Sequence, residues 1–510
     1  MLNLQQIDLS MPDQRQRLRS RGICVVIPTY NNEGTVEDVV NRSKQQCLDV
    51  IVVNDGCTDR TPDILADIDD VTVVTLRRNS GKGAALREGF RKAKSMGFAY
   101  AITIDADGQH FPEDIPAMLE ANIKHPGSLL IGERKDLATM ERSGGSRFAN
   151  AFSNFWFCVQ TGQHLRDTQT GFRLYPLHRL HALQLLTSRY EAELELLVFS
   201  AWHGVRLVQV PVSVYYPPRE ERVSHFRPAY DFTRISVLNT VLCVLALVYG
   251  LPLWLLRKAA TFLRTAYSLA FFLIFTLCIM TPLAVLFIRI GRMTEQKRLR
   301  LHRVLQFMAK FVMQYHGIPG VKSSVGNANA EDFSKPAVIL CNHQSHLDLM
   351  PMLQLSEKIV VLTKDWVWHN PFYGYVIRNA EFYPVSMGTD ELLPRLRSLV
   401  ERGYSIVVYP EGTRSEDCSI MRFHQGAFYL AKELGIDILP TILYGAGKVL
   451  PKKDKHLHRG TIHIEIDRRF SPQDMDSLGE LRERARWFRR YYKMRYRELC
   501  DNFEKYAATE

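Results

Sequence analysis

The sequence predicts an α/β protein with two α/β domains joined by an apolar membrane hairpin. Short β-branched runs alternate with longer amphipathic runs between residues 23 and 104, and again between residues 337 and 467. Such alternation is typical of sheets whose mainly parallel strands are connected by helices. Two long apolar runs lie between these regions, and 510 residues exceed what one hydrophobic core usually serves. We therefore expect two cores.

The predicted boundaries define five segments. They are an N-terminal extension at 1–20, an α/β domain at 21–230, the hairpin at 231–290, a second α/β domain at 291–470 and a basic C-terminal helix at 471–510.

Composition narrows the class of partner. A net charge of +11 favours anionic lipid or an acidic carrier protein. Nucleic acid is not expected, because no recognition-helix or RNA-binding motif accompanies the charge. The nine cysteines include no CxxC pair, which argues against a disulfide framework or a zinc site. The first 21 residues are polar and basic, so they do not read as a secretory signal.

The first domain places polar residues at three strand ends. Strands are predicted at Ile23–Ile27, Val50–Val53, Val71–Leu76 and Tyr100–Ile104, with helices at Thr35–Gln46 and Gly83–Ala93. Ligands of such sheets bind beyond the carboxyl ends of the strands. Pro28-Thr29-Tyr30, Asn54-Asp55-Gly56 and Asp105-Ala106-Asp107 each follow one. This shared placement predicts one site built from three distant segments.

Asp105 and Asp107 are the chemically most informative pair of this domain. Two carboxylates one residue apart can both reach a divalent cation and the diphosphate that it neutralises. A sugar diphosphate needs this neutralisation, because negative charge builds on it as the glycosidic bond breaks. The pair therefore predicts a nucleotide-sugar site with Mg²⁺ or Mn²⁺ as cofactor.

Together with residues 26–30, 52–59 and 79–89, this pair resembles family 2 glycosyltransferases of the A-type fold, especially polyprenyl-phosphate sugar transferases. The resemblance covers roughly residues 20–230. It implies that the nucleoside is held by Pro28, Thr29, Tyr30 and Asp55, the metal and diphosphate by Asp105, Asp107 and Gln109, and phosphate groups by Arg134 and Arg147. Asp107 is the expected catalytic residue, and the segment ending in Arg173 is expected beside the acceptor. Asn32 and Asn54 depart from the usual acidic residues, which leaves the base and sugar open.

The acceptor decides whether sugar transfer needs a base. A lipid phosphate is already ionised, whereas a hydroxyl must lose its proton. Glu193 and Glu195 are the candidates for a base, although a helix surface is the favoured interpretation of both. Lys82 lies in a Gly-Lys-Gly turn that resembles a phosphate loop, but the full Walker spacing is absent, so an ATP site is not expected.

The apolar runs Ile235–Leu256 and Tyr267–Ile288 are each long enough to cross a bilayer, which needs about 20 residues. Arg257, Lys258 and Arg264 lie between them. Two full spans would place this charged loop outside, against the positive-inside tendency. We therefore expect a shallow hairpin at the inner membrane, with both domains facing the cytoplasm. Two spans remain the alternative, and a buried hairpin of a soluble domain is less favoured.

The second domain repeats the α/β pattern. Strands are predicted at Ala337–Cys341, Ile359–Leu362, Ile406–Tyr409 and Ile436–Leu439, with Thr461–Asp467 as an edge strand. Ser471-Pro472 predicts a helix N-terminus. The basic, aromatic run Arg482–Arg497 fits a membrane-surface helix or a helix packed on its own domain.

His343 and Asp348 follow the first of these strands, separated by four residues. A histidine oriented by a carboxylate can take a proton from a hydroxyl as it attacks a thioester. With residues 410–415, 423–428 and 439–440, the pair resembles the glycerolipid acyltransferase family, which includes lysophosphatidic acid acyltransferases, over roughly residues 300–470. The resemblance implies that His343 is the base, that Asp348 orients it, and that Glu411, Gly412, Thr413 and Arg414 bind the acceptor. Arg414 suits a phosphate, and His346 is expected to be structural.

The sequence thus predicts a bacterial, bifunctional, membrane-associated transferase. It would move a sugar from a nucleotide-sugar to a lipid acceptor, and an acyl group from acyl-CoA or acyl carrier protein to a lipid or glycolipid hydroxyl, in glycolipid or aryl-polyene lipid synthesis. Fusion would keep an intermediate near both sites. One alternative is an acyltransferase whose N-terminal domain only binds a nucleotide-sugar or lipid. Another is a membrane scaffold without activity.

Overall fold

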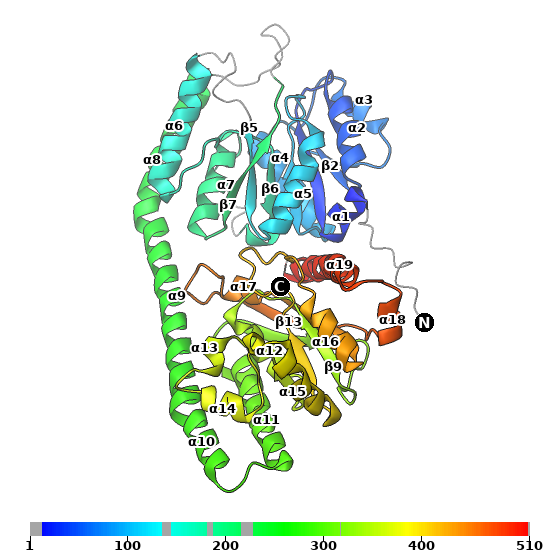
Figure 1. Ribbon diagram of the computed structural model, residues 1–510. Coiled ribbons are helices and arrows are strands. Elements are labelled where there is room, and N and C mark those ends of the chain that lie inside the picture. Colours follow the sequence, from blue (N-terminus) through cyan, green and yellow to red (C-terminus); the bar gives the residue numbers. More distant parts are fainter. Residues whose placement is uncertain (1–12, 135–143, 181–186, 216–227, 317, 508–510) are drawn as a thin grey trace. The chain divides into compact units, whose positions relative to one another are not determined.

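A computed structural model describes residues 13–134, 144–180, 187–215, 228–316 and 318–507 (Figure 1). The chain forms two compact units, one chiefly of Met11–Arg257 and the other chiefly of Lys258–Leu499. The first contains a seven-stranded sheet and the second a six-stranded sheet. The predicted pair of α/β sheets is therefore confirmed.

The N-terminal sheet is mixed rather than purely parallel. Its order is β3 (Thr72–Thr75), β2 (Val50–Asn54), β1 (Ile23–Thr29), β4 (Tyr100–Thr103), β6 (Arg173–Pro176), β5 (Leu129–Arg134) and β7 (Leu207–Val212). The four predicted strands are β1 to β4, which pair in parallel. β6 runs antiparallel to β4 and β5.

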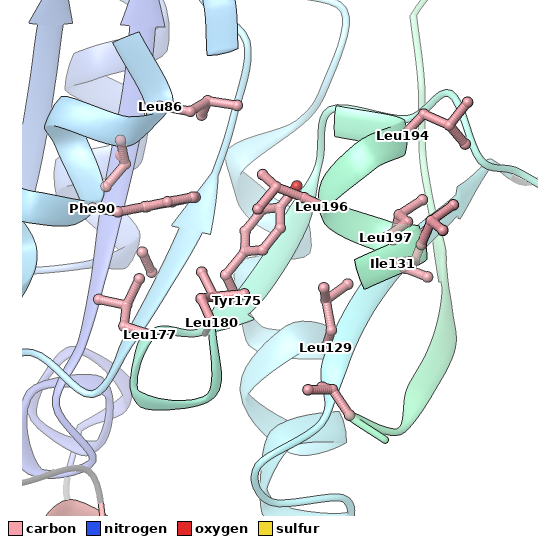
Figure 2. Close-up of a cluster of buried hydrophobic side chains, with 14 of the residues drawn as sticks. Leu86, Phe90, Leu129, Ile131, Tyr175, Leu177, Leu180, Leu194, Leu196 and Leu197 are labelled. Atoms are coloured by element: carbon pink, nitrogen blue, oxygen red, sulfur yellow. The ribbon is translucent and has the colours of Figure 1, made fainter. Parts of the chain in front are cut away.

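Helices cover both faces of this sheet, so that strand β1 is buried along its whole length. The helices of the unit are α1 (Gln14–Ser20), α2 (Val36–Gln46), α3 (Thr61–Ala66), α4 (Lys82–Ser95), α5 (Ile115–Lys124), α6 (Gly144–Thr161) and α7 (Glu191–Trp202), with short turns η2 (Pro112–Asp114) and η3 (Leu177–Arg179). Side chains alternate along a strand. Cys24 and Val26 therefore join the core under α4 and α7, while Val25 faces the core under α2 and α5. Figure 2 shows Leu194 and Leu197 of α7 among the buried side chains of β5 and β6.

The C-terminal sheet has the order β10 (Ile359–Val361), β11 (Ser405–Val408), β9 (Ala337–Cys341), β12 (Asp437–Tyr444), β13 (Gly460–Ile466) and β8 (Val321–Gly326). The first four are parallel, and β13 is antiparallel to β12. The prediction that residues 461–467 form an edge strand is wrong, because β8 pairs with the other side of β13. The polar Val-Lys-Ser-Ser-Val-Gly sequence of β8 lacks a recognisable strand pattern.

The basic C-terminal run Arg482–Arg497 lies in α19, one of the helices around the C-terminal sheet. They are α11 (Glu295–Lys310), α12 (Leu349–Leu353), α13 (Asp365–Trp368), α14 (Gly374–Asn379), α15 (Thr389–Glu401), α16 (Gly426–Leu434), α17 (Ala446–Val449), α18 (Pro472–Asp476) and α19 (Leu481–Ala507), with short turns η7 (Phe311–His316), η8 (His346–Asp348) and η9 (Val385–Met387). Ser471 caps α18, as predicted. In α19, Trp487 and Phe488 are buried, and the Tyr492 hydroxyl donates to the Leu340 carbonyl at 2.8 Å. This run packs on its own unit.

The predicted hairpin is wrong. Phe232–Arg289 forms one helix of 58 residues, long and apolar enough by length and composition to cross a membrane. It belongs to a continuous run of helical elements, namely α8 (Pro228–Leu245), η5 (Ala246–Gly250), α9 (Leu251–Phe272), η6 (Leu273–Met280) and α10 (Thr281–Arg289) (Figure 1). The cations at 257, 258 and 264 lie inside α9, because no turn-forming residue accompanies them. Pro252 and Pro282 each follow a π-helical stretch, a local adjustment that accommodates a proline.

Candidate active sites

The three predicted strand-end segments of the N-terminal unit meet at one edge of its sheet. The Asp55 N–H donates to the Thr29 carbonyl at 3.0 Å, which joins the ends of β2 and β1. The Thr35 hydroxyl donates to the Ala106 carbonyl at 2.6 Å, which joins the start of α2 to the carboxylate segment. The three segments therefore form one site.

A buried lysine occupies the centre of this site. Lys82 Nζ lies 2.7 Å from Oδ1 of Asp105 and 2.8 Å from Oε2 of Glu193. Burial opposes ionisation of Asp105, but the adjacent ammonium outweighs it and holds the pKa of this carboxyl below its usual value. The interpretation of Glu193 and Glu195 as surface residues is wrong, because both side chains are buried. The hydroxyl of Thr187 donates to Glu195 at 2.7 Å.

The surroundings of Asp107, the second carboxylate of the pair, favour the binding of a positive charge. Burial, and then the charge of Asp105, raise the pKa of Asp107 to about 6. A divalent cation shared by the two carboxylates would relieve this repulsion, and carboxylate and amide oxygens are suitable ligands for Mg²⁺ or Mn²⁺. Gln109, two residues after Asp107, adds a side-chain amide oxygen. Its backbone N–H donates to Asp107 Oδ1 at 3.0 Å. Within the described ranges, no group of three or more His, Cys, Asp or Glu side chains is placed to hold a metal ion. Asp105, Asp107 and Gln109 remain the expected ligands of a cation at this position.

The residues expected to hold the nucleoside lie at the same edge. Pro28 and Thr29 end β1, and Tyr30 follows it. Asp55 is buried, and its carboxylate accepts the N–H groups of Ser80 at 2.7 Å and Gly81 at 2.8 Å. Asp55 therefore braces the loop that leads into α4 and Lys82.

Arg134 and Arg147 were expected near phosphate groups and Arg173 beside the acceptor, and the two that the structure describes in full, Arg134 and Arg173, already have protein partners. Arg134 donates two hydrogen bonds to Asp167, and the one from Nη2 to Oδ1 is 2.7 Å long. Arg173 is fully buried and donates to the carbonyls of Glu193 and Thr168, both at 2.8 Å. The side chain of Arg147 lies outside the described residues.

In the C-terminal unit, His343 and Asp348 form a hydrogen-bonded pair just after β9. His343 Nδ1 lies 2.8 Å from Oδ2 of Asp348, which is buried. This contact favours the tautomer with a proton on Nδ1, so that Nε2 can accept a proton from a substrate. The His343 ring packs on the ring of Tyr409, with centroids 4.5 Å apart. Asp348 thus contacts the edge of the imidazole and Tyr409 contacts its face, and together they fix the orientation of the ring.

Glu411 holds the loops around this pair together. Its carboxylate accepts the N–H of His343 and the N–H of Met421, both at 2.9 Å. Burial raises the pKa of Glu411 to about 7, although both hydrogen bonds oppose the rise. Gly412 and Thr413 continue this loop, with Gly412 in the left-handed region at φ 66°. Glu411 therefore supports the site through the backbone.

Cationic side chains gather around His346, three residues beyond His343. Partial burial, and then the charges of Arg414, His343 and Lys364, lower the pKa of His346. Within residues 318–507, the side chains of Arg414 and Lys364 have no hydrogen bond or ion pair with protein groups. These charges suit a phosphate or another anion. The sequence interpretation missed Lys364, whose signal is its place just beyond β10, as His343 lies just beyond β9.

The glycosyl transferase family 2 model matches residues 24–168. Polyprenol monophosphomannose synthase of Mycolicibacterium smegmatis is 30% identical over 216 residues, which cover 39% of this chain and 79% of that protein. The N-terminal unit belongs to glycosyltransferase family 2. UDP-N-acetylglucosamine–dolichyl-phosphate N-acetylglucosaminyltransferase of Methanococcus voltae is 28% identical over 217 residues, which cover 38% of this chain and 86% of that protein.

The acyltransferase family model matches residues 321–444. The chloroplastic 1-acyl-sn-glycerol-3-phosphate acyltransferase LPAT1 of Arabidopsis thaliana is 28% identical over 215 residues, which cover 41% of this chain but only 58% of that protein. The two family matches do not overlap, consistent with a fusion of a glycosyltransferase unit and an acyltransferase unit. The chain is a transferase.

Solved structures resemble each unit at low identity. The acyltransferase PlsC of Thermotoga maritima is 19% identical, covers 48% of this chain and 98% of its own, and has a TM-score of 0.42. Glucosyl-3-phosphoglycerate synthase of Mycobacterium tuberculosis, solved with Mn²⁺, UDP-glucose and phosphoglyceric acid, is 19% identical, covers 46% and 82%, and has a TM-score of 0.36.

Proposed function

We propose that this chain carries out two group transfers on lipid acceptors at a membrane. The glycosyltransferase unit moves a sugar from a nucleotide-sugar, and the acyltransferase unit moves an acyl group from acyl-CoA or acyl carrier protein to a hydroxyl. The observation that supports this most strongly is that each unit retains its reactive groups at the strand ends of its own sheet. These groups are Asp105, Asp107 and Lys82 in one unit, and His343, Asp348 and Arg414 in the other.

For sugar transfer, Asp105, Asp107 and Gln109 would hold a divalent cation, which would neutralise the diphosphate leaving group. Lys82 places a second positive charge at the same position. A lipid phosphate acceptor attacks without a base because its oxygen is already ionised. Two relatives support such an acceptor, since their names specify a polyprenol monophosphomannose product and a dolichyl-phosphate substrate.

For acyl transfer, His343 Nε2 accepts the proton of the acceptor hydroxyl as its oxygen attacks the thioester carbonyl. The carbon–sulfur bond then breaks, and the thiolate leaves with the proton that His343 returns. Asp348 holds the ring and stabilises the imidazolium that forms between these steps. Arg414 and Lys364 bind an anionic group of the acceptor. No covalent acyl-enzyme forms, because the hydroxyl attacks the thioester directly.

The apolar helix Phe232–Arg289 supports attachment to the membrane. Nucleotide-sugars and acyl thioesters are both cytoplasmic metabolites, so both units must face the cytoplasm. A helix that crossed the bilayer once would separate them. The helix therefore lies along the inner membrane, within one leaflet. Trypsin added to intact spheroplasts should leave both units undigested, and digestion of either unit there would contradict this placement.

Mass spectrometry of cellular lipids tests the combined function. Cells that contain the chain should hold a lipid with both a sugar and an added acyl group, and deletion should remove it. Loss of an acylated lipid without sugar would instead favour an acyltransferase whose N-terminal unit only binds.

A further inference from the structure

Lys82 is shared by two carboxylates that come from different parts of the glycosyltransferase unit. Its Nζ atom lies 2.7 Å from Oδ1 and 2.9 Å from Oδ2 of Asp105. The same atom lies 2.8 Å from Oε2 of Glu193. The side chains of Lys82 and Glu193 are only 15% and 9% exposed. One largely buried ammonium thus joins an expected cation ligand, Asp105, to a carboxylate that has no role in the chemistry described so far.

The backbones that carry Lys82 and Glu193 are held close together. Lys82 is the first residue of α4, and Glu193 lies in the first turn of α7. These helices approach so closely that a Cβ at Gly83 would lie 2.3 Å from the Cβ of Ala192. Arg173 donates to the Glu193 carbonyl at 2.8 Å, which anchors the start of α7. The ion pair is therefore fixed by the packing of its own helices.

This geometry does not suit Glu193 as the base of sugar transfer. A base needs an oxygen within hydrogen-bond reach of the acceptor proton. Oε2 of Glu193 contacts Lys82, and Oε1 is buried without a hydrogen-bond partner among the described residues. A proton taken up by Glu193 would also remove one of the two negative charges that compensate the buried ammonium, and uncompensated buried charge is costly. Glu193 fits a permanent counter-ion better than a base.

The charges around Lys82 match a divalent cation. Asp105, Asp107 and Glu193 contribute three negative charges and Lys82 contributes one positive charge, which leaves two negative charges. Without Glu193, the ammonium would be compensated by Asp105 alone. The pair of expected ligands would then carry less net negative charge, and the charge of the ligand set is what tunes the affinity of such sites for a divalent cation.

We propose that Glu193 is the counter-ion of Lys82 and a positioning residue that sets the affinity of Asp105 and Asp107 for a divalent cation. It acts through Lys82 and keeps the ammonium from neutralising Asp105. The inference rests on the cation site of the proposed function. It also leaves Glu193 unavailable as a base, which agrees with an acceptor phosphate that is already ionised.

Titration of the full-length protein with Mn²⁺ alone, followed by electron paramagnetic resonance of the free ion, tests the proposal without turnover. Binding that Asp107→Ala removes is assigned to this site. Glu193→Gln should weaken this binding by about 10–100-fold, the range typical of groups that support metal ligands. Lys82→Met should tighten it, because Asp105 is then uncompensated. The double variant should return close to wild type, since it removes one charge of each sign.

The matched control is Glu191→Gln in the same helix. Glu191 is a buried carboxylate that accepts a hydrogen bond from Arg234 at 3.0 Å, so the variant removes the same charge from a different ion pair. It should bind Mn²⁺ as wild type does. Wild-type affinity in Glu193→Gln, or an equal loss in both single variants, would overturn the proposal. If Glu193→Gln does not fold, the double variant decides, because it leaves neither charge of the pair buried alone. Weak Mn²⁺ binding by a folded double variant would then overturn it.

Sugar transfer separates a counter-ion from a base. Glu193→Gln should raise the KM for Mn²⁺ and recover a kcat close to that of wild type at saturating Mn²⁺. A kcat that stays low at every Mn²⁺ concentration would assign Glu193 to the base and overturn the proposal. Wild-type protein that shows no Mn²⁺ binding sensitive to Asp107→Ala would contradict the cation site of the proposed function itself. Normal wild-type binding that Glu193→Gln leaves unchanged would contradict the counter-ion alone.

Discussion

Oδ2 of Asp348 lies 2.8 Å from Nδ1 of His343 and also accepts the backbone N–H groups of Gln344 at 2.6 Å and Ser345 at 2.9 Å. One oxygen therefore accepts three donors, which fixes the carboxylate to its own loop before it orients the imidazole. The pair is a rigid unit of a single turn.

Asp348→Asn should reduce acyl transfer, because a neutral amide cannot stabilise the imidazolium and its NH₂ group opposes these donors. General-base catalysis contributes about 10²–10⁴-fold, and the loss should approach that range. Initial rates with a labelled acyl thioester measure it, with sugar transfer as the internal control. Wild-type acylation by the variant, or a trapped acyl-protein, would exclude the proposed mechanism.

Glu411→Gln should change the pH dependence of stability. The folded pKa of about 7 lies above the usual value near 4.5, so the folded state favours the neutral acid. This contribution is fully present below the unfolded pKa and is lost as the pH rises through about 7. Thermal unfolding of the acyltransferase unit should therefore depend less on pH in the variant than in wild type across this window. Identical pH profiles would show that Glu411 does not titrate there.

Sugar transfer should fall as the pH drops through about 6, because Asp107 must be ionised to hold a cation and burial beside Asp105 raises its pKa. Protons and the cation compete for the same carboxylate. Raising the Mn²⁺ concentration should therefore move the acid limb of the profile to lower pH. A limb that stays fixed at all Mn²⁺ concentrations would assign it to another group.

Gly171→Ala should damage the glycosyltransferase site selectively. A Cβ at this position would lie 2.3 Å from Oδ2 of Asp105 and 2.8 Å from Nζ of Lys82, so both charged groups must shift. Displacement of reacting groups by about 1 Å can cost about 10²-fold in rate. Gly34→Ala is the matched control, because its Cβ would meet no atom within 4 Å. Equal sugar-transfer rates for the two variants would refute the effect, and acyl transfer should be unchanged in both.

The features that could be predicted from the sequence are those that depend on a local pattern of residues. Strands β1 to β4 and β9 to β12 appear as apolar runs, and the polar residues that follow them identify the edges where side chains converge. Burial of Glu193 could not be predicted in this way, because Lys82 is distant in sequence and only the fold brings the two charges together. Lys364 was missed for the same reason, since its role depends on the ends of β10 and β9, which lie on either side of β11 in the sheet.

The prediction of a hairpin was wrong because the charged residues between the two apolar runs were taken to mark a turn. Arg257 and Arg264 lie in a stretch without glycine or proline, and such residues continue a helix. Arg264 also finds an acceptor, the Leu457 carbonyl at 3.2 Å. A cation between two apolar runs therefore does not by itself break a helix.

The central claim is that one chain performs two independent transfers, and the most direct measurement assays both reactions on three purified full-length proteins. Wild type should transfer sugar from a UDP- or GDP-sugar and an acyl group from a thioester to lipid acceptors. Asp107→Ala should lose sugar transfer and keep acylation, whereas His343→Ala should lose acylation by about 10²-fold or more and keep sugar transfer. Sugar transfer that survives in Asp107→Ala, or acylation that survives in His343→Ala, would contradict the account.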